Sequence, residues 1–143
     1  MCDPSTISFA SNPDTSAELG SVLDLLARAL QRYRYRFASE KQLHEGIAYV
    51  LSAEGIHFEH EYPVTHACRL DFWCRERGIV IEAKVAGTLP EALHQVDRYL
   101  TLEASRAALV LSTRPWARQP GIAKDYVLRG KPVRVVHLKA QSF

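Results

Sequence analysis

The chain has 143 residues, of which 47% are hydrophobic and 24% are charged, and its formal net charge is +2 at pH 7. This length suits one domain with a buried core, while the small net charge does not by itself identify a nucleic-acid-binding protein. Cys2, Cys68 and Cys74 have neither the density of a disulfide scaffold nor the spacing of a zinc site. With no signal-peptide pattern and no apolar stretch of membrane-spanning length, we expect a cytoplasmic protein without membrane contact.

Residues 1–16 are rich in Ser, Asp, Pro and Thr, and we expect a flexible tail there, followed by one domain over residues 17–143. Apolar residues at helical spacing predict an N-terminal helix that begins after Ser16 and continues to about residue 30. The next segment, QRYRYRF, either ends this helix or begins an exposed basic edge. Ser39 and Gln42 form an S-x-x-Q capping box, which predicts a second helix that ends at Gly55.

After this helix the apolar period changes to two, which predicts strands at 56–64, 67–75 and 78–86. Thr88 and Glu91 form another capping box and predict a helix that reaches Leu100. The wholly apolar segment 107–113 indicates a central strand, 122–130 a short helix and 131–139 a last strand. This order predicts an α/β (α+β) fold, a mixed central sheet flanked by helices.

Two acids and a lysine interrupt the apolar strands. Because alternate residues of a strand share a face, Glu82 and Lys84 should project from one side of the third strand. In the strand before it, Asp71 should lie with Arg69 and Trp73, opposite an apolar set of Leu70, Phe72 and Cys74. If the two strands pair, Asp71 and Glu82 converge. Two neighbouring carboxylates repel each other, and Lys84 leaves a charge deficit that Mg²⁺ or Mn²⁺ would fill.

The segment RLDFW…IVIEAKV contains D-x(10)-E-x-K on two adjacent predicted strands, and HQVDRYL contains Q-x-x-x-Y. Together these motifs resemble the PD-(D/E)XK nuclease superfamily, in particular its RecB-like QxxxY members, with Leu70 in place of the proline. The resemblance covers about residues 39–138 and implies a restriction-endonuclease-like αβββαβ core with an extra N-terminal helix. It also implies a metal-dependent DNA nuclease that hydrolyses phosphodiester bonds and leaves 5′-phosphate ends.

By this resemblance, Asp71, Glu82 and the backbone carbonyl of Ala83 would bind the metal ion, and Lys84 would orient or deprotonate the attacking water. Many members add a glutamate from the preceding helix. We prefer Glu40, which falls on the apolar stripe of that helix, to Glu45, which falls on the opposite face.

Other residues are candidates for contacts around this site. Gln95 could hold Lys84 or a phosphate, and Tyr99 could pack over the acids. Arg69 and Arg98 could bind phosphates, and Trp73 could stack on a base or pack within the core. The six histidines show no metal-ligand spacing and are expected to be surface or core residues.

DNA is the expected partner, and one small core covers few base pairs, so we expect a homodimer or a larger complex. Two alternatives remain open: a branched-DNA endonuclease similar to Holliday-junction resolvases, and a catalytically silent DNA-binding or assembly module. Neither a G-x-S-x-G elbow nor a Gly-rich phosphate loop is present, which argues against a serine hydrolase and an NTPase.

Overall fold

A computed structural model describes residues 16–141, so the expected tail at residues 1–16 lies outside the described residues except for Ser16. None of the helices in residues 16–141 is long and apolar enough to cross a membrane. The elements follow one another along the chain as α2 (Ser16–Gln31), β1 (Arg34–Tyr35), α3 (Glu40–Ala53), β2 (Glu59–Thr65), β3 (Cys68–Cys74), β4 (Ile79–Lys84), α4 (Leu89–Tyr99), β5 (Ala107–Ser112), the 3-10 turn η1 (Pro115–Ala117), β6 (Asp125–Leu128), β7 (Lys131–His137) and β8 (Lys139–Ala140).

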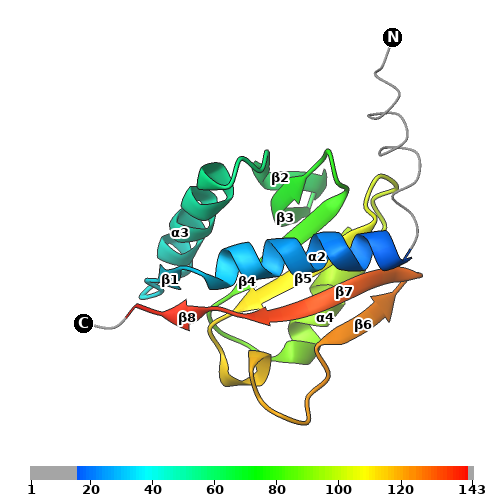
Figure 1. Ribbon diagram of the computed structural model, residues 1–143. Helices are drawn as coiled ribbons and strands as arrows, with labels where there is room; N and C mark the ends of the chain where they lie inside the picture. Colours follow the sequence, from blue (N-terminus) through cyan, green and yellow to red (C-terminus); the bar gives the residue numbers. More distant parts are fainter. Residues whose placement is uncertain (1–15, 142–143) are drawn as a thin grey trace.

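Six strands form one mixed sheet in the order β2-β3-β4-β5-β7-β6 (Figure 1). The pairs β4–β5 and β5–β7 are parallel, whereas β2–β3, β3–β4 and β6–β7 are antiparallel. All six residues of β5 are buried, and β5 lies between β4 and β7, as its apolar sequence predicted. The expected mixed sheet flanked by helices is therefore confirmed.

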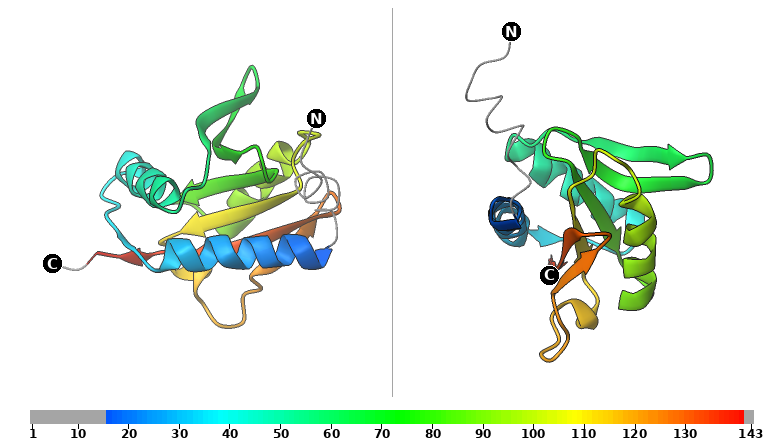
Figure 2. Two further views of the ribbon diagram at one scale, coloured as in Figure 1. Left: turned by 45° about the horizontal axis from the view of Figure 1, so that its top comes forward. Right: turned by 90° about the vertical axis from the view of Figure 1, so that its right-hand side faces the viewer.

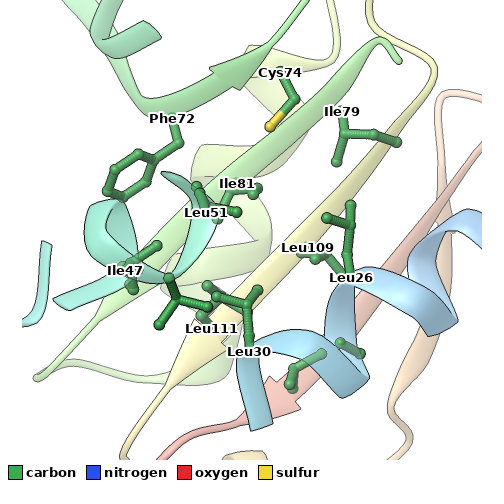
Figure 3. Packing of buried hydrophobic residues seen from close by; sticks show 14 of the residues in the cluster. Leu26, Leu30, Ile47, Leu51, Phe72, Cys74, Ile79, Ile81, Leu109 and Leu111 are labelled. Carbon is green, nitrogen blue, oxygen red and sulfur yellow. The ribbon is translucent and has the colours of Figure 1, made fainter. Parts of the chain in front are cut away.

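Helices cover both faces of this sheet. Helices α2 and α3 lie on one face and α4 lies on the other, while the β2–β3 hairpin extends beyond them (Figure 2). Figure 3 shows Leu30 of α2 and Ile47 of α3 directed at the strand residues Ile81 and Leu111. A second buried cluster, which includes Val96 of α4, fills the space beneath the other face. The central strands β4 and β5 are thus buried on both sides, whereas the edge strands β2 and β6 are not.

The predicted helix boundaries follow from local capping. Ser39 Oγ accepts a 3.1 Å hydrogen bond from the backbone N–H of Gln42, whose own side chain accepts from Ala38 N–H rather than from Ser39. The Thr88–Glu91 capping box is complete. Gly55 follows α3 with φ of +73°, a conformation in which glycine avoids the steric cost of a side chain.

The predicted short helix over residues 122–130 is wrong. Residues Asp125–Leu128 form β6, which pairs antiparallel with β7. Arg129 and Gly130 both have positive φ, 53° and 72°, and connect the two strands. A two-residue turn of this kind matches the twist of paired strands, so it favours a β-hairpin over a helix in this segment. The segment was too short for its alternation to be distinguished from helical spacing.

The segment QRYRYRF does end the first helix, because α2 stops at Gln31. It then forms β1, which pairs in parallel with β8 near the end of the described chain. Tyr35 of β1 is buried, and its hydroxyl donates a 2.6 Å hydrogen bond to the carbonyl of Leu30. The basic residues around Tyr35 are exposed on the outside of this small sheet.

Candidate metal centre and active site

Asp71 lies where the pairing between β3 and β4 ends. The paired register extends from Cys74 and Ile79 to Phe72 and Ile81, so the next opposed positions are Asp71 and Glu82. The Asp71 carboxylate lies in the gap between the two strands beyond their last pair, and its Oδ2 accepts a 2.8 Å hydrogen bond from the backbone N–H of Ala83. Its side chain is 18% exposed and thus remains reachable from solvent.

The alternation of β3 breaks at Asp71. Phe72 and Cys74 pack in the cluster beneath α2 and α3, while Trp73 packs in the cluster beneath α4. Leu70 should have joined Phe72 and Cys74, but it packs beneath α4 with Trp73. The expected face of Leu70 is therefore wrong, because strict alternation does not continue past Asp71, where β3 is no longer paired with β4.

Glu82 is a buried acid next to Asp71, and only 2% of its surface is exposed. Burial raises the pKa of Glu82 to about 8, with a further increase from Asp71 that the nearby Lys84 only partly offsets. Lys84 Nζ lies 3.3 Å from Glu82 Oε2. Glu82 Oε1 is buried and has no hydrogen-bond partner within residues 16–141. When both acids are ionised, Lys84 alone does not balance their negative charge.

Ser112 at the end of β5 holds the backbone around Lys84. The two residues are register partners across β4 and β5, and Ser112 Oγ donates a 2.7 Å hydrogen bond to the carbonyl of Lys84. The same hydroxyl accepts a 3.0 Å hydrogen bond from the backbone N–H of Arg114. The sequence analysis missed Ser112, although a hydroxyl at the end of the apolar run AALVLS was a detectable signal.

Tyr99 of α4 lies near the same acids, and Gln95 precedes it by one helical turn. Tyr99 is 4% exposed, and its pKa is raised by burial first and then by the charges of Glu82 and Asp71. Gln95 is half-buried, and its Oε1 is buried with no hydrogen-bond partner in the described part of the chain. Tyr99 therefore lies next to the acid pair. The Oε1 atom of Gln95 remains able to accept a hydrogen bond from a ligand or from another side chain.

His44, which the sequence analysis did not select, also contacts this site. It is 7% exposed, its Nε2 lies 3.5 Å from Asp71 Oδ2, and its Nδ1 lies 2.9 Å from Nε2 of His60. Burial by itself lowers the pKa of His44, but the close approach of Asp71 and the charges of Asp71, Glu40 and Glu61 outweigh burial and raise it. His44 and His60 come from α3 and β2, so no local spacing could have revealed them.

No protein-family model matches this chain. No curated protein and no solved structure matches it significantly either.

The remaining candidate residues lie either in the core or at the surface. Trp73 is 1% exposed and lies in the core, so it cannot stack on a base from this position. Glu40 and Glu45 are both exposed and both line the same surface cavity, so the expected contrast between their two helix faces is not observed. Arg69 and Arg98 are exposed, and Arg69 Nη1 lies 3.6 Å from Glu61 Oε1. The two arginines and the two glutamates are therefore accessible from the surface.

The arrangement of Asp71 and Glu82 suits a hard divalent cation. Carboxylate and main-chain carbonyl oxygens are the ligands that Mg²⁺ and Mn²⁺ favour, and Ala83 supplies a carbonyl between the two acidic positions. The ammonium of Lys84 lies beside the pair and can add positive charge toward an anion bound there. These groups can bind a cation and an anionic substrate at one place.

Proposed function

We propose that this chain is a metal-dependent deoxyribonuclease that hydrolyses DNA phosphodiester bonds and leaves 5′-phosphate ends. The proposal takes residues 39–138 as a restriction-endonuclease-like αβββαβ core of the PD-(D/E)XK type. The observation that carries it is the convergence of Asp71 and buried Glu82 at the opening between β3 and β4, with Lys84 Nζ 3.3 Å from Glu82.

Burial makes the acid pair costly unless a cation accompanies it. Coulomb repulsion between nearby carboxylates grows as water is excluded, and Lys84 brings one positive charge against two negative ones. Glu82 Oε1, which lacks a hydrogen-bond partner among the described residues, is available as a ligand atom. Asp71, Glu82 and the Ala83 carbonyl would hold Mg²⁺, with Mn²⁺ as an alternative. When bound, such an ion supplies Lewis-acid activation of water and stabilises charge on the phosphate.

Lys84 would position the reacting groups. Its backbone is held by the hydrogen bond from Ser112, and its ammonium is held by Glu82. From there it can orient a water molecule or donate to a phosphate oxygen as negative charge develops. Gln95 would accept a hydrogen bond from Lys84 at its Oε1, which has no hydrogen-bond partner in residues 16–141, or would donate from its side-chain amide to the phosphate. Tyr99 would pack against the acids and limit the access of water.

The DNA would approach over exposed cations. Arg69 and Arg98 are both exposed and can form bidentate hydrogen bonds with phosphates. The domain is small, so we propose that a homodimer or a larger complex supplies the remaining contact surface and the second active site needed to cut both strands.

The test is a cleavage assay on the full chain without an affinity tag. Linear, supercoiled, single-stranded and branched DNA are each incubated with Mg²⁺, Mn²⁺ or EDTA. We expect Mg²⁺-dependent cleavage that Lys84→Ala reduces by about 100-fold or more, the range for loss of an acid–base group. Lys139→Ala, which removes an exposed lysine of β8, is the matched control and should cleave like the wild type. The 5′-phosphate is checked by religating the products without prior kinase treatment.

Cleavage that persists in EDTA and in Lys84→Ala would refute the assignment of this site. A strong preference for branched substrate would instead support the endonuclease alternative that acts on DNA junctions. DNA binding without cleavage of any substrate would support the silent DNA-binding or assembly module.

A further inference from the structure

We infer that His44, His60 and Glu61 form a second metal site, distinct from the Asp71–Glu82 pair and suited to Zn²⁺ or a similar transition-metal ion. Each of the three residues offers a ligand atom, and these atoms lie within 4.8 Å of one another. Two imidazoles and one carboxylate form a set that zinc accepts readily, whereas Mg²⁺ prefers oxygen ligands alone. The two sites would therefore select different ions.

The two histidine nitrogens lie close to the spacing that zinc requires, and the Glu61 carboxylate oxygen lies within 4.8 Å of them. Tetrahedral coordination with bonds of about 2.0–2.1 Å places neighbouring ligand atoms about 3.3 Å apart. His44 Nδ1 and His60 Nε2 lie 2.9 Å apart, so the rings would separate by a few tenths of an ångström. His60 and Glu61 are exposed and can make this movement, while His44 is buried and provides the fixed ligand.

The backbone of β2 brings His60 and Glu61 to the same place. In a regular strand, consecutive side chains point to opposite faces. Glu61 has φ of +54°, a left-handed conformation that costs a residue with a side chain about 1–2 kcal/mol. This residue interrupts the alternation of the strand and lets both side chains reach His44. Strained conformations of this kind are concentrated at functional positions.

His44 is already oriented as a metal ligand. Its Nε2 faces Asp71 Oδ2 at 3.5 Å, and its Nδ1 is directed at His60. A histidine that binds a metal ion commonly donates its other ring N–H to a carboxylate, which fixes the tautomer and the ring orientation. Phe72 supports both rings, with centroid distances of 5.3 Å to His44 and 4.9 Å to His60. The His44 ring is therefore held in place before any ion binds, and His60 packs on the same phenyl ring.

The cluster is open to solvent. His44, His60 and Glu61 line a surface cavity of about 390 Å³, together with Glu40, Lys41, Glu45 and Ala48. Three protein ligands with an open fourth position are typical of exchangeable or catalytic zinc sites rather than closed structural ones. Glu40 and Glu45 add two negative charges around the cavity, and Lys41 adds one positive charge, so the net charge of these three residues is negative.

An existing contact of Glu61 opposes metal binding only weakly. Glu61 Oε1 lies 3.6 Å from Arg69 Nη1, and both side chains are more than half exposed. Exposed ion pairs of this kind stabilise a protein by about 0–1 kcal/mol. An ion bound by two imidazoles can therefore recruit the Glu61 carboxylate away from Arg69 at little cost.

The test is a titration of the full, tag-free chain with Co²⁺, which reports tetrahedral coordination through its visible absorption bands. We expect one Co²⁺ per chain at micromolar concentration, with Zn²⁺ in competition. His60→Ala and Glu61→Gln should each weaken binding by at least about 10-fold, the smallest loss seen even for residues that only support a ligand. His94→Ala, which removes an exposed histidine of α4, is the matched control and should bind like the wild type.

A further variant separates this site from the proposed nuclease centre. Glu82→Gln should leave Co²⁺ binding unchanged, whether or not the chain cleaves DNA. Loss of Co²⁺ binding in Glu82→Gln would refute the proposal, because the ion would then sit at the carboxylate pair. Failure of the wild type to bind Co²⁺ or Zn²⁺, or full binding by His60→Ala, would refute it equally.

Discussion

The Asp71 carboxylate accepts a 2.8 Å hydrogen bond from the backbone N–H of Ala83 on the neighbouring strand. This bond replaces a ladder contact at the point where β3 and β4 separate, so Asp71 supports the sheet as well as the proposed metal site. We expect Asp71→Ala to lower the free energy of unfolding by about 1–3 kcal/mol, because it leaves a backbone donor without its partner. Chemical denaturation in EDTA measures this loss.

Asp71→Asn separates the structural role of Asp71 from the proposed role in metal binding. The amide oxygen can accept the same hydrogen bond from Ala83, so the variant should unfold within about 1 kcal/mol of the wild type. It lacks the negative charge, so Mg²⁺ affinity, measured by calorimetry, should fall. A variant as unstable as Asp71→Ala, or one with unchanged Mg²⁺ affinity, would contradict this division of roles.

Glu82 should make stability depend on pH in the metal-free chain. Its pKa is about 8 in the folded state against an ordinary value of 4.5, so the folded state holds an extra proton between these values. The resulting stabilisation is complete below pH 4.5 and is lost as the pH rises through about 8. The side chain introduced in the variant Glu82→Gln does not titrate. The free energy of unfolding of this variant relative to wild type should therefore increase by at least about 1 kcal/mol between pH 5 and pH 9, which corresponds to a pKa shift of roughly one unit.

The measurement is urea denaturation of both proteins in EDTA across this pH range. The difference between variant and wild type isolates Glu82 from other titrating groups. Parallel pH profiles for the two proteins would show that Glu82 is not held protonated by its surroundings.

Ser112 should influence the proposed reaction through the backbone of Lys84. Ser112→Ala removes a donor to the Lys84 carbonyl and an acceptor for Arg114 N–H, so we expect a loss of about 1–3 kcal/mol in stability and slower cleavage. Ser105→Ala is the control, because Ser105 is equally buried and its Oγ donates to the carbonyl of Leu102 at 2.6 Å, away from the acids. Both variants should be destabilised, but cleavage by the folded protein should slow only in Ser112→Ala.

Gln95 offers a test of a polar group without a structural partner. Its Oε1 has no hydrogen-bond partner within residues 16–141, so Gln95→Met should change the free energy of unfolding by less than about 1 kcal/mol. If Gln95 contacts Lys84 or a phosphate during the reaction, cleavage should fall although stability does not. The exposed neighbour His94 provides the control variant His94→Ala. Unchanged cleavage by Gln95→Met would remove Gln95 from the proposed site.

Local sequence determined most of the framework around the acids. The capping residues Ser39 and Thr88 begin α3 and α4, because such caps need only neighbours within one helical turn. Glu82 and Lys84 project together from β4, as alternation predicted, and their charged groups lie 3.3 Å apart. Alternation succeeded there because β4 is a regular strand in the middle of a buried sheet.

Tertiary structure decided the position of Leu70 and the cluster of His44, His60 and Glu61. Alternation assumes ordinary strand dihedrals and continuous pairing, but Glu61 adopts a positive φ and the pairing of β3 with β4 ends at Phe72, next to Asp71. The histidines meet because α3 packs over the β2–β3 hairpin, and no spacing in the sequence encodes that contact. Periodicity is a property of neighbouring backbone units, whereas the convergence of side chains from separate elements depends on how the whole sheet and its helices pack.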